Sequence, residues 1–330
     1  MKIVYSSKHQ RHFPLSHLQE YGNEEYPEIP KRVEIIKSTL TQNHFGEFEE
    51  PSHYDETILR EIHSNEYINY LISLKNIISD DGYHIPTTFS NTPEKKDIHS
   101  LGYFSSDLSA PVNNDIFEEA SISLSCAHTA TDLLLKGEHI TFSLSRPPGH
   151  HAMKNKMGGF CYLNNTAYSA QLLSKHGRVA ILDVDEHHGN GTQDIFYERN
   201  DVFTLSLHAD PKGFYPFHWG FEDELGAGKG RGYNLNIPLP PQTNNATYQP
   251  HLEKAIHTIA QFDPSYLVVA LGFDTYEKDT LGNFLLTSEY YSTMAKTIAT
   301  LKKPTVFILE GGYYLPDLGT NTLTFLHHFV

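Results

Sequence analysis

Short apolar runs rich in Val, Ile, Leu and Phe alternate with longer amphipathic stretches along this chain. The apolar runs predict strands at Lys2–Tyr5, Ile140–Leu144, Val179–Val184, Val202–Leu207, Leu267–Leu271 and Thr305–Leu309. The amphipathic stretches predict helices that include Phe117–Leu135, Thr166–Lys175, Ala246–Gln261 and Glu289–Leu301. This alternation is typical of an α/β protein with a parallel sheet.

The chain is expected to form one domain over residues 1–330. Its 330 residues exceed the usual size of a single domain, but α/β domains of this length occur, and no Ser/Gly/Pro-rich linker divides the sequence. Two stretches, Ser79–Asn114 and Ala209–Gly232, are rich in polar residues, Gly or Pro and are expected to be long loops. Loops of this length in a compact domain usually have a functional role or form an interface.

The charge balance argues against nucleic acid as a partner. The formal net charge is −15, from 40 acidic and 25 basic residues, whereas phosphate binding requires basic patches. Such a field would attract a small cationic substrate, although an acidic balance also serves solubility. The charge is therefore compatible with a cationic substrate and does not require one.

The cysteine content and the apolar segments indicate a cellular location. The two cysteines, Cys126 and Cys161, do not suggest a disulfide framework, which favours a reducing compartment. The first residues lack the apolar core of a signal peptide, and no apolar run is long enough to span a bilayer. We expect a soluble, cytoplasmic protein with no membrane partner.

Four polar clusters follow predicted strands directly or within a few residues. They are Gly149-His150-His151, Asp183-Val184-Asp185-Glu186-His187-His188, Gly272-Phe273-Asp274 and Glu310-Gly311-Gly312-Tyr313. In open α/β sheets, ligands bind beyond the carboxyl ends of the strands. A single histidine in a chain with 21 of them is most simply a surface group, but the four clusters together predict one site.

The clusters also carry a family resemblance. The run Asp-X-Asp-X-His-His-Gly-Asn-Gly, preceded by Arg-Pro-Pro-Gly-His-His and followed by Gly-Phe-Asp and Glu-Gly-Gly-Tyr, resembles the histone deacetylase superfamily. The chain is most similar to the bacterial acetylpolyamine amidohydrolase branch, and the resemblance extends from Tyr26–Arg32 to Tyr313. It implies the arginase/deacetylase fold, with a central parallel sheet flanked by helices on both faces.

A metal site is expected from Asp185, His187 and Asp274, which offer two carboxylates and one imidazole. Along an extended chain Asp183, Asp185 and His187 point the same way, so the spacing favours convergence. Three protein ligands with an open position are typical of catalytic zinc. We expect Zn²⁺, with Fe²⁺ or Co²⁺ as alternatives, because geometry and availability select the metal in cells.

The resemblance pairs each active-site histidine with a polar partner. It places His150 beside Asp183 and His151 beside Asn190, and it favours His151 as general base and acid and His150 as its electrostatic partner. Because a carboxylate raises the basicity of an imidazole and a neutral amide does not, the two histidines are expected to differ in pKa. The sequence by itself does not order their roles, and adjacent histidines can also simply cap a loop.

Tyr313 completes the expected catalytic set. The two glycines before it allow close backbone approach, and its neutral phenol can donate a hydrogen bond to an oxyanion. This role depends on the Glu-Gly-Gly-Tyr match, since a tyrosine is more often a packing residue.

Substrate-binding residues are also implied by the resemblance. Gly159, Phe160 and Tyr215 are similar to family positions that line a narrow tunnel, although the two aromatic residues could equally belong to the core. Glu118, with Asp107 or Glu119 as weaker candidates, is expected to meet a distal ammonium group, unless it is simply solvated.

Three further implications concern ions and assembly. The family pattern suggests K⁺ or Na⁺ held by Asp183 and Asp185, with Ser206 and the backbone around Leu207 as further oxygen donors. An inserted loop, which falls near Ser79–Asn114 here, is associated in this branch with dimerisation and with a narrowed active site. A homodimer is therefore expected.

The leading hypothesis is a metal-dependent amidohydrolase that removes acetyl groups from acetylated polyamines or similar acylated amines. One alternative is a protein lysine deacetylase, which requires a tunnel mouth open to a peptide. Another is a catalytically silent binder of acetylated ligands, against which the complete set of catalytic residues argues. A dimanganese ureohydrolase would need a second set of bridging ligands, and the sequence shows one set.

Overall fold

A single parallel sheet forms the centre of the computed structural model, which describes residues 1–14, 26–80, 82–92 and 97–329. Eight strands lie in the order β2-β1-β3-β8-β7-β4-β5-β6, and each neighbouring pair is parallel. The strands are β1 (Lys2–Val4), β2 (Glu47–Glu49), β3 (Ile140–Ser143), β4 (Val179–Asp183), β5 (Val202–Ala209), β6 (Asn234–Leu239), β7 (Tyr266–Leu271) and β8 (Thr305–Leu309). Each of the six predicted strands is present, within two residues of its expected ends.

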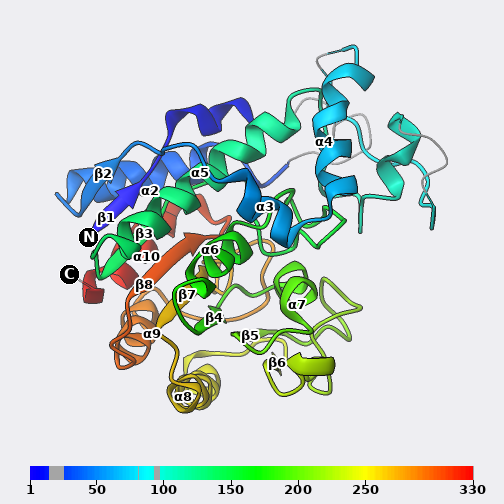
Figure 1. Ribbon diagram of the computed structural model, residues 1–330. Helices are drawn as coiled ribbons and strands as arrows, with labels where there is room; N and C mark the ends of the chain where they lie inside the picture. Colours follow the sequence, from blue (N-terminus) through cyan, green and yellow to red (C-terminus); the bar gives the residue numbers. More distant parts are fainter. Residues whose placement is uncertain (15–25, 81, 93–96, 330) are drawn as a thin grey trace.

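Helices cover both faces of this sheet (Figure 1). The α-helices are α2 (Lys31–Gln42), α3 (Glu56–Ile62), α4 (Asn65–Ile77), α5 (Ile116–Leu135), α6 (Asn165–Ser174), α7 (Asn190–Phe196), α8 (Asn245–Phe262), α9 (Tyr290–Ala299) and α10 (Leu315–Leu326). Short 3₁₀ helices are η1 (Ser7–Arg11), η3 (Ile98–Gly102), η4 (Gly228–Gly230) and η5 (His327–Phe329). No helix in the described ranges is long and apolar enough to cross a lipid bilayer.

Two hydrophobic cores lie on opposite faces of the sheet. Ala180 and Leu182 of β4 pack in the core that contains α2, α8, α9 and α10, whereas Val179 and Ile181 pack in the core that contains α3 to α7. Because successive side chains of a strand point to opposite faces, a strand covered on both sides is apolar throughout. This arrangement confirms the predicted central parallel sheet flanked by helices on both faces and explains the continuous apolar runs.

The two strands that the sequence analysis did not assign are the edges of the sheet. β2 has the sequence Glu-Phe-Glu and is half-exposed. β6 carries Asn234 and Asn236, whose side-chain amides both donate to Oε1 of Gln193, at 2.9 and 2.8 Å. Both strands therefore lack the apolar run by which the central strands were identified.

The two expected loops contain little regular structure, as predicted. Within 79–114 the structure shows η3 and one antiparallel bridge between His84 and Val112, while residues 81 and 93–96 of this stretch lie outside the described residues. The loop 209–232 contains η4, and its first residue, Ala209, ends β5. Both loops contribute to the cavity described below.

Candidate active site

The four polar clusters gather at one edge of the sheet because of the strand order. β3, β8, β7 and β4 are consecutive neighbours, and each cluster follows the carboxyl end of one of them. In parallel strands these ends meet at the same edge. Segments that are far apart in the chain are thereby brought together.

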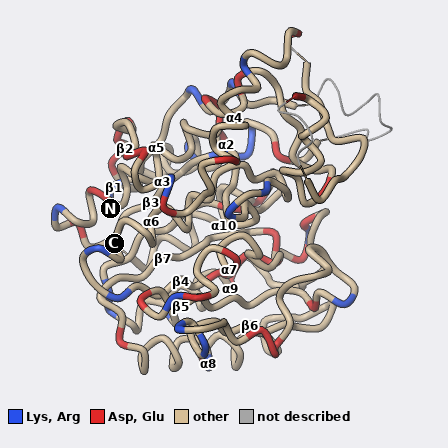
Figure 2. The backbone as a smooth tube through the Cα atoms, turned by 45° about the vertical axis from the view of Figure 1, so that its right-hand side comes forward, with Lys and Arg blue, Asp and Glu red and all other residues tan. Residues whose placement is uncertain are grey.

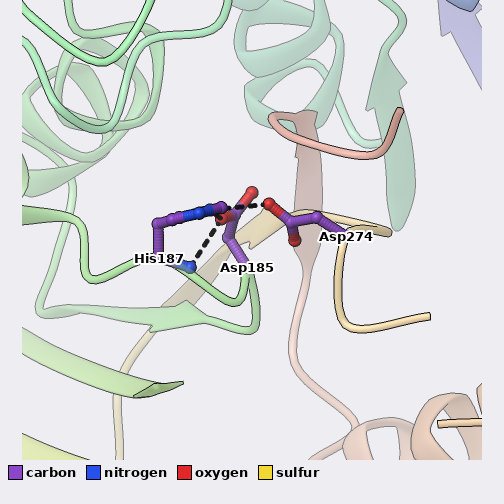
Figure 3. A group of neighbouring side chains, drawn as sticks. All are labelled: Asp185, His187 and Asp274. Atoms are coloured by element: carbon purple, nitrogen blue, oxygen red, sulfur yellow. Dashed lines mark hydrogen bonds and ion pairs between the residues drawn. The ribbon is translucent and has the colours of Figure 1, made fainter. Parts of the chain in front are cut away.

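Asp185, His187 and Asp274 form a compact donor triangle (Figure 3). Nδ1 of His187 lies 2.9 Å from Oδ2 of Asp274 and 3.3 Å from Oδ1 of Asp185, and all three donor atoms lie within 4.8 Å of one another. Ligands placed about 2.0–2.2 Å from a tetrahedral ion are separated by about 3.3 Å. The donor types and their spacing fit one divalent ion.

Two glycines make room for this triangle. A Cβ atom on Gly272 would lie 2.1 Å from Oδ2 of Asp185, and one on Gly311 would lie 2.4 Å from Oδ2 of Asp274. The Gly311 N–H also donates to Oδ2 of Asp185 over 2.8 Å. The glycines quoted in the sequence motifs therefore allow the backbone to approach the carboxylates closely.

The histidine pair has the two partners that the resemblance implied. The ring centroids of His150 and His151 are 3.9 Å apart. Nδ1 of His150 lies 3.0 Å from Oδ2 of Asp183, and Nδ1 of His151 lies 2.7 Å from Oδ1 of Asn190. Each Nδ1–H thus donates to its partner, which leaves each Nε2 directed away from it.

Different surroundings shift the pKa values of the two imidazoles in opposite directions. Burial lowers the pKa of His150, but the carboxylates of Asp183, Asp185 and Glu310 outweigh it and raise this pKa to about 10. Burial, reinforced by the neighbouring imidazoles of His150 and His187, lowers the pKa of His151 well below its usual value. The expected difference in pKa between the two histidines is present.

Tyr313 lines the same cavity as the histidine pair. Its ring packs edge-on against Phe160 at 5.9 Å, and the guanidinium of Arg32 lies 4.6 Å from its ring centroid. Gly312 has φ +116°, a conformation that glycine adopts readily and that sets the direction of the following residue. Within the described part of the chain, no hydrogen bond occupies the Tyr313 hydroxyl, so it is available to a ligand.

A cavity of about 470 Å³ opens above these groups. Its lining consists of Asp107, Leu108, Ser109, Pro148, His150, His151, Gly159, Phe160, Asp185, His187, Gly213, Phe214, Tyr215, Phe217, Leu281, Gly311 and Tyr313. The three tunnel positions implied by the resemblance, Gly159, Phe160 and Tyr215, are all among them. A Cβ atom on Gly159 would lie 2.2 Å from the His151 ring, so this wall requires glycine.

The acidic candidates for substrate recognition occupy different places. Glu118 does not line the cavity; it is half-exposed at the start of α5 and pairs with Lys75 (2.5 Å) and Arg11 (3.6 Å). Glu119 is buried and accepts hydrogen bonds from Tyr83 and Asn113. Asp107 does line the cavity, where its Oδ2 accepts the Tyr215 hydroxyl at 2.6 Å and the Gly159 N–H at 3.1 Å.

Glu310 and Asp279 also shape the site, and the sequence analysis gave neither of them a role. Oε2 of Glu310 accepts the Gly149 and His150 N–H groups at 2.7 and 3.1 Å, so it holds the histidine turn. Asp279 accepts the N–H groups of Tyr313 and Tyr314. Glu310 could have been found from the sequence, because it directly follows an apolar strand and precedes a pair of glycines. Nothing in its local sequence distinguishes Asp279.

Comparisons with known proteins agree with this geometry. The family description "Histone deacetylase domain" matches residues 26–329. Acetylpolyamine amidohydrolase 1 of Pseudomonas aeruginosa is 37% identical, over 100% of this chain and 99% of its own, and the acetylpolyamine amidohydrolase of Mycoplana ramosa is 37% identical, over 99% and 98%.

A solved structure shares the whole architecture. The acetylpolyamine aminohydrolase from Burkholderia pseudomallei superposes with a TM-score of 0.93 at 32% identity, over 100% of this chain and 98% of that one. The likeness therefore covers the sheet, the helices and the loops around the site. The chain belongs to the histone deacetylase family of hydrolytic deacetylases.

Proposed function

We propose that this protein is a zinc-dependent amidohydrolase that cleaves the acetamide of acetylated polyamines or similar acylated amines, releasing acetate and the free amine. The observation that carries the proposal is the donor triangle of Asp185, His187 and Asp274 at a cavity also lined by His150, His151 and Tyr313. The names of the full-length relatives in Pseudomonas aeruginosa and Mycoplana ramosa support the substrate class.

Asp185, His187 and Asp274 would hold the ion. Bound there, Zn²⁺ would supply a Lewis acid that polarises a carbonyl and lowers the pKa of a water molecule. Fe²⁺ and Co²⁺ suit the same donors and stay alternatives.

The two histidines have different proposed roles. The neutral amide of Asn190 fixes the tautomer of His151, so that its Nε2 can accept a proton from the attacking water. The carboxylate of Asp183 stabilises a protonated His150, whose charge offsets the negative charge that develops on the amide oxygen. A histidine then donates a proton to the departing amine, and we assign that step to the pair.

Tyr313 stabilises the developing oxyanion. Tyr313 lines the cavity together with the histidines, and its hydroxyl can donate a hydrogen bond to the carbonyl oxygen as that oxygen gains charge. Because a donor of this kind binds the transition state more strongly than the ground state, it increases kcat.

Two properties of the cavity, together with the net charge of the whole chain, support a cationic, chain-like substrate. Phe160, Phe214 and Tyr215 offer aromatic faces to methylene groups and to an ammonium group. Asp107 adds a carboxylate to the wall, and no Lys or Arg is among the described lining residues. Lys and Arg positions are interspersed among Asp and Glu positions along the chain (Figure 2), and the net charge is −15. The electrostatics therefore favour polyamines over acidic ligands.

Steady-state deacetylation on a matched panel tests the proposal. The zinc-loaded protein is assayed with acetylputrescine, acetylspermidine, acetylcadaverine and an acetyl-lysine peptide. We expect higher kcat/KM on the free polyamines. A preference for the peptide would indicate a protein lysine deacetylase, and measurable binding without turnover of any substrate would indicate a silent binder.

Three earlier predictions stay proposals. Asp183 and Ser206 are register partners on β4 and β5, which supports a shared K⁺ or Na⁺ site nearby. The homodimer and the cytoplasmic location follow from the family resemblance and from the cysteine content. The mass of the protein in solution, measured by light scattering, tests the dimer.

A further inference from the structure

Asp279 is a buried carboxylate that faces backbone donors rather than the substrate. It is 9% exposed and lies in the segment between β7 and α9. Its Oδ2 accepts the N–H of Tyr313 at 2.6 Å and the N–H of Tyr314 at 3.0 Å, and its Oδ1 accepts the N–H of Leu281 at 3.0 Å. Hydrogen bonds to an ionised acceptor are roughly twice as strong as neutral ones.

We propose that Asp279 is a positioning residue for Tyr313, and that it sets the turnover rate of the proposed deacetylation by fixing the turn that carries the phenol. The inference rests on the proposed function for its effect on rate. Its structural part, the ordering of the turn from Gly311 to Tyr314, stands on the hydrogen bonds alone.

The turn needs such a restraint because glycines precede Tyr313. Gly311 and Gly312 leave the backbone more conformational freedom than other residues would, and Gly312 adopts φ +116°. Arg32 restrains the turn at Gly312, since its Nε donates to the Gly312 carbonyl at 2.6 Å. Asp279 holds the two N–H groups that follow. An acceptor of the turn is thus held by Arg32 and two of its donors are held by Asp279.

The same carboxylate joins the tyrosine to a wall of the cavity. Leu281 lines the cavity, and its N–H is the third donor to Asp279. Asp274, a proposed metal ligand, lies five residues earlier in the same segment. Asp279 therefore couples the loop after β7, which carries a metal ligand and a wall residue, to the loop after β8, which carries the phenol.

The test compares Asp279→Asn with a matched control, Asp317→Asn. Asp317, in the first turn of α10, also contacts the loop after β7, because it accepts the Tyr276 hydroxyl at 2.7 Å and the Lys278 ammonium at 3.2 Å. Unlike Asp279, it has no hydrogen bond to the Tyr313 backbone among the described residues. A misplacement of about 1 Å can cost about 100-fold in rate. We expect Asp279→Asn to lower kcat by about that factor with little change in KM, and Asp317→Asn to keep the wild-type kcat.

A double-mutant cycle separates positioning from general damage. If Asp279 acts through the phenol, adding Asp279→Asn to Tyr313→Phe causes no further loss of kcat. An equal, additional loss in that background would overturn the inference, as would an unchanged kcat in the single variant. Asp279→Glu keeps the carboxylate and should recover part of the rate if the Asn variant folds poorly.

Hydrogen–deuterium exchange gives a readout that needs no activity. Asp279→Asn should speed exchange of the amides in the segment 311–316, whereas Asp317→Asn should not. Unchanged protection in the Asn variant would refute the positioning role even if the protein proved inactive on every substrate. Inactive wild-type protein with faster exchange in the variant would instead refute the proposed function and leave the structural role of Asp279 supported.

Discussion

Among the proposed catalytic side chains, the two histidines are each oriented by a partner of a particular chemical kind. Asp183 gives His150 a carboxylate, Asn190 gives His151 a neutral amide, and the hydroxyl of Tyr313 makes no hydrogen bond within the described residues. Because these partners differ in charge, adjacent and identical imidazoles acquire different proton affinities. Conservative substitutions that remove or exchange one functional group at these positions should therefore have separable effects on catalysis.

Replacement of Tyr313 by Phe removes only the hydroxyl. We expect the variant to keep its fold and to bind zinc as the wild type does, while kcat falls about 10²- to 10³-fold, the usual cost of losing one oxyanion donor. Stopped-assay kinetics with acetylputrescine, together with metal analysis of the dialysed protein, checks this. A variant that turns over at the wild-type rate would remove Tyr313 from the mechanism.

Replacement of Asp107 by Asn tests the cation preference. The amide keeps the size of the side chain but removes its charge from the cavity wall, so kcat/KM for acetylputrescine should fall about tenfold. A neutral N-alkylacetamide should lose much less. Glu118→Gln is the matched control, because Glu118 pairs with Lys75 outside the cavity. Equal losses in the two variants would show that Asp107 has no special role.

At the scale of elements, buried polar contacts fix how loops and helices meet. His63 ends α3 and precedes α4; its Nδ1–H donates to the Met153 carbonyl at 2.8 Å, and its Nε2 accepts the Asn164 N–H at 3.0 Å. Acceptance by Nε2 requires the neutral ring, because a protonated Nε2 carries no free lone pair. Asn164 caps the N-terminus of α6, and Met153 follows the histidine turn, so one imidazole joins these segments.

This contact predicts a dependence of stability on pH. Burial lowers the pKa of His63 from 6.5 to about 4, so the unfolded chain takes up a proton before the folded protein does. The neutral His63 ring therefore contributes fully to the free energy of unfolding above pH about 6.5. This contribution is lost as the pH falls toward 4, and the loss amounts to up to about 3 kcal/mol.

Urea unfolding across this pH range measures the effect. His63→Gln keeps one donor and one acceptor but does not titrate, so its stability should fall less steeply than that of the wild type between pH about 6.5 and about 4. His44→Gln, at an exposed histidine, is the control. Parallel curves for the wild type and His63→Gln would contradict the prediction.

At the scale of the whole molecule, the sheet separates two cores and leaves one edge for chemistry. The central strands are covered on both faces, and their carboxyl ends carry the polar clusters. The net charge of the whole chain is −15, and the field of such a protein should concentrate cationic substrates.

Ionic strength tests that field. Raising the salt concentration from about 0.01 M to about 1 M shortens the Debye length from about 30 Å to about 3 Å. We expect kcat/KM for acetylspermidine to fall over this range, while the value for a neutral N-alkylacetamide stays constant. Equal responses of the two substrates would show that long-range attraction does not contribute.

The local sequence determines the inner strands of the sheet and much of the candidate site. Continuous apolar runs identified the six inner strands, because a strand buried on both faces requires apolar side chains throughout. The edge strands β2 and β6 carry polar side chains and gave no such signal. The clusters after the strands, read with the family resemblance, indicated the donor triangle and both histidine partners, because residues at the end of a buried strand share one edge of the sheet.

The tertiary structure alone decided which distant residues meet. Glu118 and Asp107 look alike in sequence, yet the start of α5 pairs Glu118 with Lys75, whereas the 79–114 loop brings Asp107 to the cavity wall. Asp279 acquires its role from two N–H groups that lie 34 and 35 positions away. Such contacts depend on the order of the strands and on the paths of the loops between them, and these arise from the packing of the whole chain.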